Sequence, residues 1–177
     1  KRQAQDLVNL YGDTFETPLL TNDGIVIPEI GLKEALRSEK YLNKVPTIAG
    51  SNKDEIKLWL GFSRYFIETK QSFLSKGIGI PTVEIKDEEK YQFYNEIRSK
   101  GWQLRGVQEP LENMFIAGNE DLYAYRYDWD NLRDFFVGDF SKIIGSAHAL
   151  EIPMISGDFS LAEEFAWIIY PLSLIHI

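Results

Sequence analysis

The chain has 177 residues, of which 44% are hydrophobic and 14% aromatic, which is enough apolar material for about one globular domain. Its formal net charge of −8 leaves no basic stripe, so nucleic acid and anionic membrane surfaces are not expected as partners. The sequence contains no cysteine, which excludes a disulfide framework and a thiolate zinc site within these residues. It also has no run of about 18 apolar residues that would predict a membrane span.

Helical patterns dominate the chain before residue 45. Apolar spacing predicts helices over residues 3–10 and 32–40. Between these helices, turn residues flank residues 25–27, Ile-Val-Ile, and predict a turn around a short extended segment.

The first predicted strand lies at residues 45–50, VPTIAG. This run is mostly apolar, does not alternate and ends in glycine, which is typical of a buried parallel strand. A helix is expected to follow over residues 51–62, where Ser51 or Asn52 can act as the N-terminal cap.

A second strand is predicted at residues 122–130, LYAYRYDWD, because aromatic side chains alternate strictly with the other residues. The two strands are separated by an irregular stretch, residues 63–85, a charged amphipathic helix over residues 86–100 and one or two short helices over residues 101–119. An apolar helix is expected over residues 161–171. Parallel strands need helical crossovers, so this order predicts an α/β protein. Two strands alone form only a marginally stable sheet, and further strands are expected outside this chain.

Two polar residues that follow the predicted strands are candidates for acid–base chemistry. Glu55 comes just after the first strand, and His148 lies in a loop after the second. The carboxyl ends of parallel strands form the edge where α/β proteins place catalytic groups, and a carboxylate there can fix the tautomer of an imidazole. The alternative for Glu55 is a capping box with Asn52, three residues earlier.

A metal site is the alternative for the histidine. His148 and Glu151 form an H-x-x-E pair, which on a helix would place two metal ligands on one face. No third ligand lies nearby in the sequence, so no metal site is expected.

Four segments of the chain, taken in order, resemble sequence motifs of one known enzyme family. They are TNDGIVIP at residues 21–28, VPTIAGSNKDE at 45–55, LYAYRYDWD at 122–130 and GSAHALEIPMISGDF at 145–159. These segments resemble the DG-x-x-x-P stretch, the VPvxxGxNxDE segment, a strand and the GaxHgxElpyvFG segment of the type-B carboxylesterases, the family that also contains cholinesterases and several lipases. The resemblance covers nearly all of residues 3–171.

This resemblance implies an α/β-hydrolase fold. Residues 1–171 would form the C-terminal part of one such domain, with the last strands of a mostly parallel sheet and a helical segment that forms a pocket wall. Glu55 would be the catalytic acid and His148 the general base, in the order that α/β-hydrolases use. Glu151 falls on a family glutamate beside the histidine, as a group that holds the loop and its water network or as a local loop cap.

Aromatic side chains between the acid and the histidine fall where the family builds its acyl and alcohol pockets. By this resemblance an apolar gorge would be lined by Trp59, Phe62, Tyr65, Phe66 and Trp102. The alternative is that these residues belong to the hydrophobic core.

The chain also departs from the family pattern. The family's serine nucleophile, in a GESAG-type elbow, and its glycine-rich oxyanion turn precede the first matched segment, and this chain contains neither. Ser63, in GFSRY, lacks the second glycine and follows the acid, so an ordinary turn or cap serine is expected. Ala149 replaces the usual glycine after the histidine, and Ile155 and Ser156 replace an aromatic pair.

The function expected from the resemblance is hydrolysis of a small-molecule carboxylic ester by a Ser-His-Glu triad through an acyl-enzyme, with no metal or organic cofactor. The chain alone is expected to be inactive, because its nucleophile and oxyanion hole would lie elsewhere. One alternative is a non-catalytic, cholinesterase-like recognition or adhesion protein. Another is a small binding domain with an accidental resemblance. The sequence predicts neither a compartment nor an oligomeric state.

The last six residues, 172–177, read LSLIHI and match the in-frame translation of a sequencing adapter. They are interpreted as adapter read-through, so His176 is excluded from functional reasoning. The alternative is a short apolar tail. Residues 1–171 by themselves are expected to be insoluble or molten, because segments that would pack on the rest of the sheet would expose apolar faces.

Overall fold

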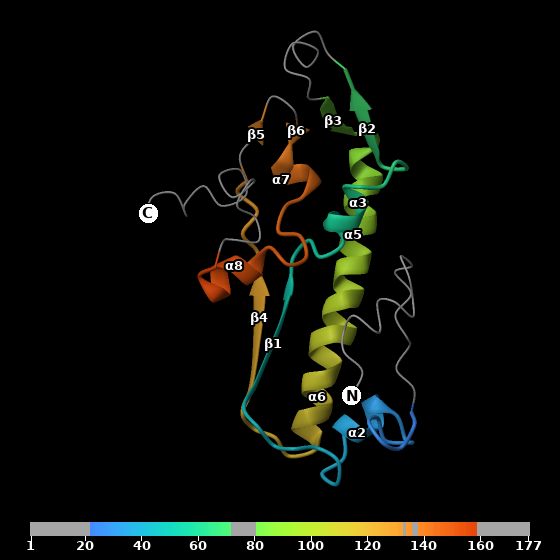
Figure 1. Cartoon of the computed structure of the whole chain (residues 1–177), viewed down its shortest axis with the longest axis vertical. Helices are drawn as coiled ribbons and strands as arrows, with labels where there is room; N and C mark the ends of the chain where they lie inside the picture. Colours follow the sequence, from blue (N-terminus) through green and yellow to red (C-terminus); the bar gives the residue numbers. More distant parts are fainter. Residues whose placement is uncertain (1–21, 72–80, 133, 136–137, 159–177) are drawn as a thin grey trace, which may run out of the picture.

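The computed structural model describes residues 22–71, 81–132, 134–135 and 138–158 (Figure 1). It is a mixed α/β arrangement in which helices lie beside small two-stranded sheets. The helices predicted over residues 3–10 and 161–171 lie outside the described residues. Across the described ranges, no helix has both the length and the apolar character needed to cross a bilayer.

The two strands predicted from the sequence pair with each other in parallel. β1 (Thr47–Asn52) and β4 (Leu122–Tyr127) run side by side, in a register that joins Thr47 to Leu122 and Asn52 to Tyr127. The chain between them contains the helical crossover that parallel pairing requires. Parallel strands are therefore confirmed at these positions, but β1 is not buried along its whole length, because Ile48 is 70% exposed.

Gly50 allows the ring of Tyr125 to lie against β1. The two residues are register partners, and a Cβ atom on Gly50 would lie 2.2 Å from ring atoms of Tyr125. Only a residue without a side chain fits beneath this ring. The contact fixes the strand pair close to the turn that carries Glu55.

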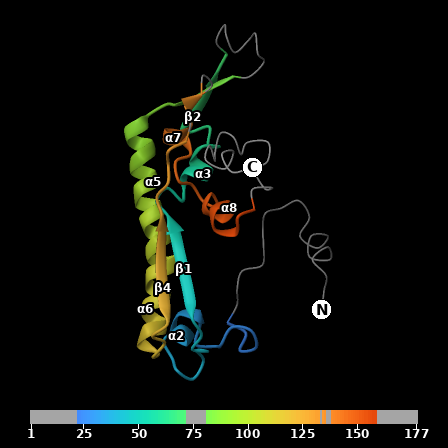
Figure 2. The same ribbon diagram turned by 90° about the vertical axis from the view of Figure 1, so that its left-hand side faces the viewer.

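A long helical run packs along the parallel strands (Figure 2). α5 (Glu88–Gln103) continues through a π-helical segment, η1 (Leu104–Gln108), into α6 (Glu109–Ile116). The carboxylate of Asp87 caps the run by accepting a hydrogen bond from the third helical N–H at 3.0 Å. The π-helical segment comes just before Pro110, which has no N–H to donate to the preceding turn. The helix predicted over residues 86–100 is confirmed, but the one or two short helices predicted over residues 101–119 are instead its nearly continuous extension to Ile116.

Two predictions about extended segments are wrong. Residues 25–27 do not form an extended segment, because the N–H groups of residues 25 and 26 both donate to the Asp23 carboxylate at 2.9 Å. An aspartate that bonds its own backbone in this way competes with strand formation. Residues 63–85 are not irregular throughout, because β2 (Ile67–Lys70) pairs antiparallel with β3 (Thr82–Ile85).

The helix after β1 is shorter than predicted. α3 spans Lys57–Leu60 instead of residues 51–62, and it begins without a side-chain cap. Ser51 and Asn52 do not cap it because both belong to β1, where they are buried. The backbone even continues the sheet by one further bond, from the N–H of Lys53 to the carbonyl of Tyr127 at 2.9 Å.

The remaining elements are short, and only the first of them was predicted: α2 (Leu32–Leu36), β5 (Asp134–Phe135), β6 (Gly138–Asp139), α7 (Phe140–Ile143) and α8 (Glu151–Ser156). The main core brings together Ile56, Leu60, Phe66, Ile67, Tyr91 and Ile143. Tyr91 is fully buried there and donates its hydroxyl to the carbonyl of Ile143 at 2.6 Å. Because Ile56 and Leu60 belong to it, the core anchors the turn and helix next to Glu55.

Candidate active site

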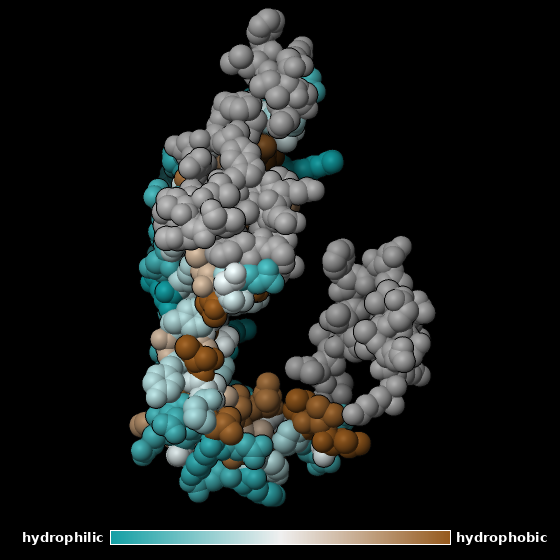
Figure 3. Space-filling model, turned by 60° about the vertical axis from the view of Figure 1, so that its left-hand side comes forward, coloured by the Kyte–Doolittle hydropathy of each residue, from teal (hydrophilic) through white to brown (hydrophobic). Residues whose placement is uncertain are grey.

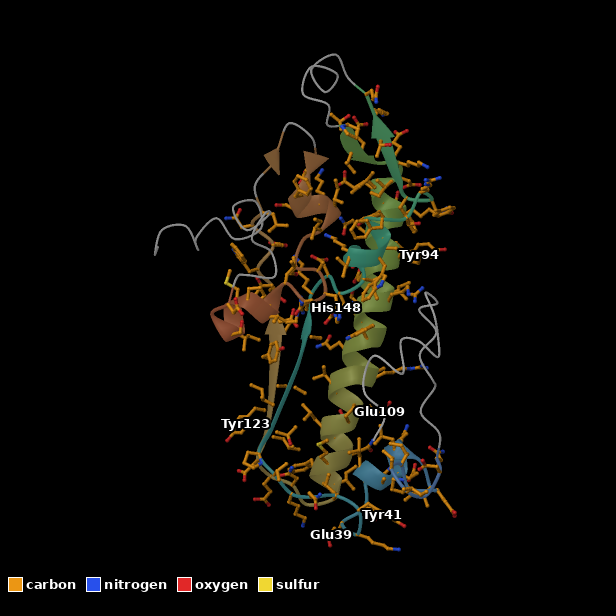
Figure 4. The ribbon with its side chains drawn as sticks, in the orientation of Figure 1. Glu39, Tyr41, Tyr94, Glu109, Tyr123 and His148 are labelled. Atoms are coloured by element: carbon orange, nitrogen blue, oxygen red, sulfur yellow. The ribbon has the colours of Figure 1, made fainter. Side chains whose placement is uncertain are left out.

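Glu55 and His148 meet just after the carboxyl end of β1. Figure 4 labels His148 at this place. Glu55 lies in the turn between β1 and α3, and His148 lies in the turn that leads into α8. The Nδ1 atom of His148 is 2.7 Å from Oε2 of Glu55, and the backbone N–H of His148 donates to the Glu55 carbonyl at 3.3 Å. The fold thus joins two side chains that are 93 residues apart in the sequence.

Each carboxylate oxygen of Glu55 has its own partner. Oε2 faces His148, and Oε1 accepts a hydrogen bond from the backbone N–H of Asn52 at 2.8 Å. The side chain is only 4% exposed, so the carboxylate is held in place on both sides. Glu55 thus makes the bond to the Asn52 N–H that a capping box would include, but Asn52 belongs to β1 and caps no helix, and the same carboxylate also contacts the histidine.

The orientation of the His148 ring leaves one nitrogen available. In the neutral imidazole, Nδ1 donates its proton to Glu55, so Nε2 carries the lone pair. Within the part of the chain that the structure describes, no group is hydrogen-bonded to Nε2. The side chain is 38% exposed, and the rings of Trp59 and Trp102 flank it at centroid distances of 5.1 and 5.2 Å. His148 therefore keeps one accessible nitrogen that can accept a proton.

Asn52 ties the histidine loop to β1. Its amide nitrogen donates to the carbonyl of Ala147 at 2.7 Å and to the carboxylate of Glu151. Glu151 lies in the first turn of α8 but makes this bond across the molecule instead of capping its own helix. The structure therefore places Glu151 in the support of the loop.

A second buried carboxylate, Asp54, was missed by sequence reasoning. It accepts hydrogen bonds from Asn95 on α5 at 2.6 Å and from the backbone N–H of Ser146 at 3.3 Å. The amino group of Lys57 lies 3.4 Å from it, and burial lowers the pKa of this lysine while the Asp54 carboxylate opposes that shift. Because Ser146 lies two residues before His148, Asp54 links the histidine loop to α5. The one feature of the sequence that could have indicated Asp54 is its position directly before Glu55, the predicted acid.

The backbone enters the left-handed region on both sides of His148. Gly145 has φ 53°, and a Cβ atom there would lie 2.4 Å from Oδ2 of Asp54. Ala149 has φ 71°, in the region that favours glycine, and it occupies the position where the resemblance places a glycine. The loop thus adopts a glycine-like conformation at residue 149 although the residue is alanine.

The aromatic residues proposed for a pocket wall fall into different environments. Trp59 and Trp102 contact each other at a centroid distance of 5.9 Å and both flank the imidazole. Phe62 and Tyr65 lie on the surface, 83% and 59% exposed, and no contact joins them to the imidazole among the described residues. Phe66 is buried in the main core. The pocket alternative therefore suits the two tryptophans, and the core alternative suits Phe66.

Ser63 is placed as a turn residue. Its hydroxyl accepts a hydrogen bond from the backbone N–H of Tyr65 at 3.4 Å, and its carbonyl accepts from residues 66 and 67. No serine or threonine hydroxyl among the described residues is hydrogen-bonded to His148. Within the same residues, no group of three or more His, Asp or Glu side chains is placed to hold a metal ion. The described residues thus present a carboxylate and an imidazole in position for proton transfer.

Comparison of the chain with protein-family models, with curated proteins and with solved structures gave no match.

Proposed function

We propose that this chain carries the acid and the general base of a serine ester hydrolase, in an α/β-hydrolase fold of the type-B carboxylesterase kind. The observation that carries the proposal is the 2.7 Å contact between Nδ1 of His148 and the buried Glu55 carboxylate. The contact joins the two residues that the family resemblance assigns as base and acid. Glu55 also follows directly on a strand of a parallel pair, at the edge where such folds place catalytic groups.

In the proposed reaction, a serine hydroxyl supplied by residues outside this chain attacks the ester carbonyl. His148 accepts the serine proton at Nε2 and passes it to the departing alkoxide, so that an alcohol leaves and an acyl-enzyme remains. The same nitrogen then deprotonates water, which cleaves the acyl-enzyme to release the acid and restore the serine. Backbone N–H groups, also outside this chain, stabilise the oxyanion in both steps.

Glu55 has an orienting role in this scheme. It holds the tautomer in which Nε2 is free, and its negative charge stabilises the imidazolium that forms after proton transfer. The substrate is a small-molecule carboxylic ester. The proposed steps use neither a metal ion nor an organic cofactor.

The proposal is tested in the complete protein, with the upstream residues that it requires, by following hydrolysis of a short-chain aryl ester. His148→Ala should lower kcat by about 10³-fold or more, because the general base is lost. Glu55→Gln should lower kcat by less, because the orienting group is the more dispensable member of such triads. Glu89→Gln makes the same chemical change at an exposed position of α5 and should leave kcat/KM unchanged.

Near-normal turnover in folded His148→Ala would refute the assignment of the base. Circular dichroism of each purified variant separates a loss of turnover from a loss of folding. A replaced serine in the upstream G-x-S-x-G elbow, together with the absence of ester turnover, would instead favour a non-catalytic recognition protein.

A further inference from the structure

We infer that the pocket beside His148 selects esters whose aryl group carries a negative charge, with Arg98 as the residue that sets this preference. The inference rests on the proposed ester hydrolysis and adds the charge class of the substrate. Its elements are an exposed tryptophan pair, a mainly apolar pocket and one cation that has no ion pair or hydrogen bond among the described residues.

The tryptophan pair, with ring planes tilted by 34°, provides an exposed apolar surface next to the imidazole of His148. Trp59 and Trp102 remain 48% and 40% exposed although their rings contact the imidazole of His148. Figure 4 shows His148 between β1 and α5, beside α3. A group stacked on these rings would therefore lie near Nε2 and lose its contact with water, which favours an aryl substituent.

The tryptophans lead into a pocket of about 420 Å³ between α3 and α5. Its lining is Ile56, Trp59, Leu60, Ser63, Arg98 and Trp102. This volume lies in the range of small-molecule sites, whose walls are mainly apolar with a few polar groups that fix orientation. Of these described lining residues, Arg98 alone carries an ionisable group.

Arg98 lies on the same face of α5 as Trp102, one helical turn earlier. Among the described residues it forms no ion pair and no hydrogen bond, whereas Lys100 on the same helix pairs with Glu96 at 2.8 Å. The residues one turn away on either side are Tyr94, Asn95, Gly101 and Trp102, none of which carries a carboxylate. The guanidinium is thus available for a carboxylate, which it can bind through two parallel hydrogen bonds.

Arg98 also determines whether the pocket prefers an anionic or a cationic substrate. Tryptophan faces alone would attract a cationic ligand, but a guanidinium in the same pocket repels it. The net charge of −8 over the whole chain acts in the opposite direction on an anion. At physiological ionic strength such distant charges are screened over about 8 Å, so the adjacent guanidinium dominates.

The test compares three aryl esters that differ in one substituent: none, a carboxylate or a trimethylammonium group. In the complete protein, Arg98→Gln should lower kcat/KM for the carboxylated ester about tenfold, mainly through KM, and should raise it for the cationic ester. The neutral ester should change less than either. Because each ester is compared between the variant and the unmodified protein, the electronic effect of the substituent cancels.

Arg37→Gln is the matched control, because Arg37 follows α2, which contacts α6 at the far end of the helical run, and it is exposed. It makes the same change in net charge and should leave all three esters unaffected. Equal effects of Arg98→Gln on the three esters, or the same pattern in Arg37→Gln, would overturn the inference.

A binding measurement separates this inference from the proposed function. Naphthoate should quench the tryptophan fluorescence of the complete protein, with a Kd about tenfold lower than in Arg98→Gln. If naphthoate binds in this way and no ester is hydrolysed, the proposed function fails and the inferred pocket stands. If a naphthyl trimethylammonium salt binds as well as naphthoate, or if Arg98→Gln leaves the Kd unchanged, the inferred charge preference is wrong.

Discussion

Ala149 is the one residue other than glycine that has a positive φ among the described residues, at 71°. An L-residue in the left-handed region costs about 1–2 kcal/mol relative to the right-handed helical region. The residue directly follows His148, and the Asn52 amide and the Asp54 carboxylate both hold residues just before the histidine. These two contacts hold the loop that carries His148 strongly enough to retain a strained backbone at Ala149, next to the proposed base.

Ala149→Gly should stabilise the complete protein by about 0.5–1 kcal/mol. Glycine adopts this φ without a steric cost, and part of the gain is offset by its greater freedom in the unfolded chain. Urea denaturation measures the difference. Ala147→Gly, two residues earlier and fully buried, has no such strain to relieve and should be destabilising. An Ala149→Gly protein less stable than the unmodified one would argue against strain at this residue.

Residues of the candidate site differed in how far the sequence revealed them. Glu55 and His148 were singled out together because each follows a predicted strand, at the edge where α/β proteins place catalytic groups, and because each lies in a segment that resembles the family. The hydrogen bond from Asn95 to Asp54 could not be predicted from any motif or pattern in the sequence. It exists because α5 docks against the turn after β1, and docking of this kind is not encoded in a local pattern.

Helices and strands could be predicted where their local sequence patterns are long and regular. β4 was predicted from strict alternation, and α5 from a charged amphipathic pattern over residues 86–100. β2 and β3 have four residues each, which is too short for alternation to stand out. Their pairing depends on contact between them, as the turn at residues 25–27 depends on a single carboxylate.

Gly50→Ala tests the strand pair as an element. The added Cβ atom would lie 2.2 Å from the ring of Tyr125, so the ring or the strand has to move. We expect a loss of about 2 kcal/mol or more in the free energy of unfolding, as for other overpacked sites. A lower kcat should accompany it, because β1 leads directly into the turn that carries Glu55.

Two further variants make this test specific. Tyr125→Ala removes the ring, so Gly50→Ala should cost much less in that background than in the unmodified protein. Gly101→Ala, on α5, meets no atom within 4 Å and should be neutral or stabilising, because alanine favours a helix. Equal costs of Gly50→Ala in both backgrounds would show that the ring is not the source of the clash.

At the scale of the whole molecule, apolar side chains remain at the surface. Figure 3 shows brown side chains gathered at the lower end, where the segment before α2 lies, and Ile25 and Val26 there are 89% and 76% exposed. Further exposed residues are Ile48 on β1, Phe62 after α3 and Tyr123 on β4. β1 and β4 pair only with each other within the described residues, so each strand also has an open hydrogen-bonding edge. Such surfaces are typical of contacts with further polypeptide.

Residues 1–171 produced alone should therefore be insoluble, or should behave as a molten state with strong binding of anilinonaphthalene sulfonate and no sharp thermal transition. The physical reason is that a two-stranded sheet is marginal in water and that the exposed side chains at Ile48 and Tyr123 gain no burial within the described residues. Fluorescence of the dye and near-ultraviolet circular dichroism during heating measure both properties.

In the complete protein, the rest of the proposed sheet would cover these strands, so this protein should bind little dye and melt cooperatively. A soluble preparation of residues 1–171 that melts in one cooperative step would contradict this expectation, and it would favour a small self-contained binding domain over part of a hydrolase.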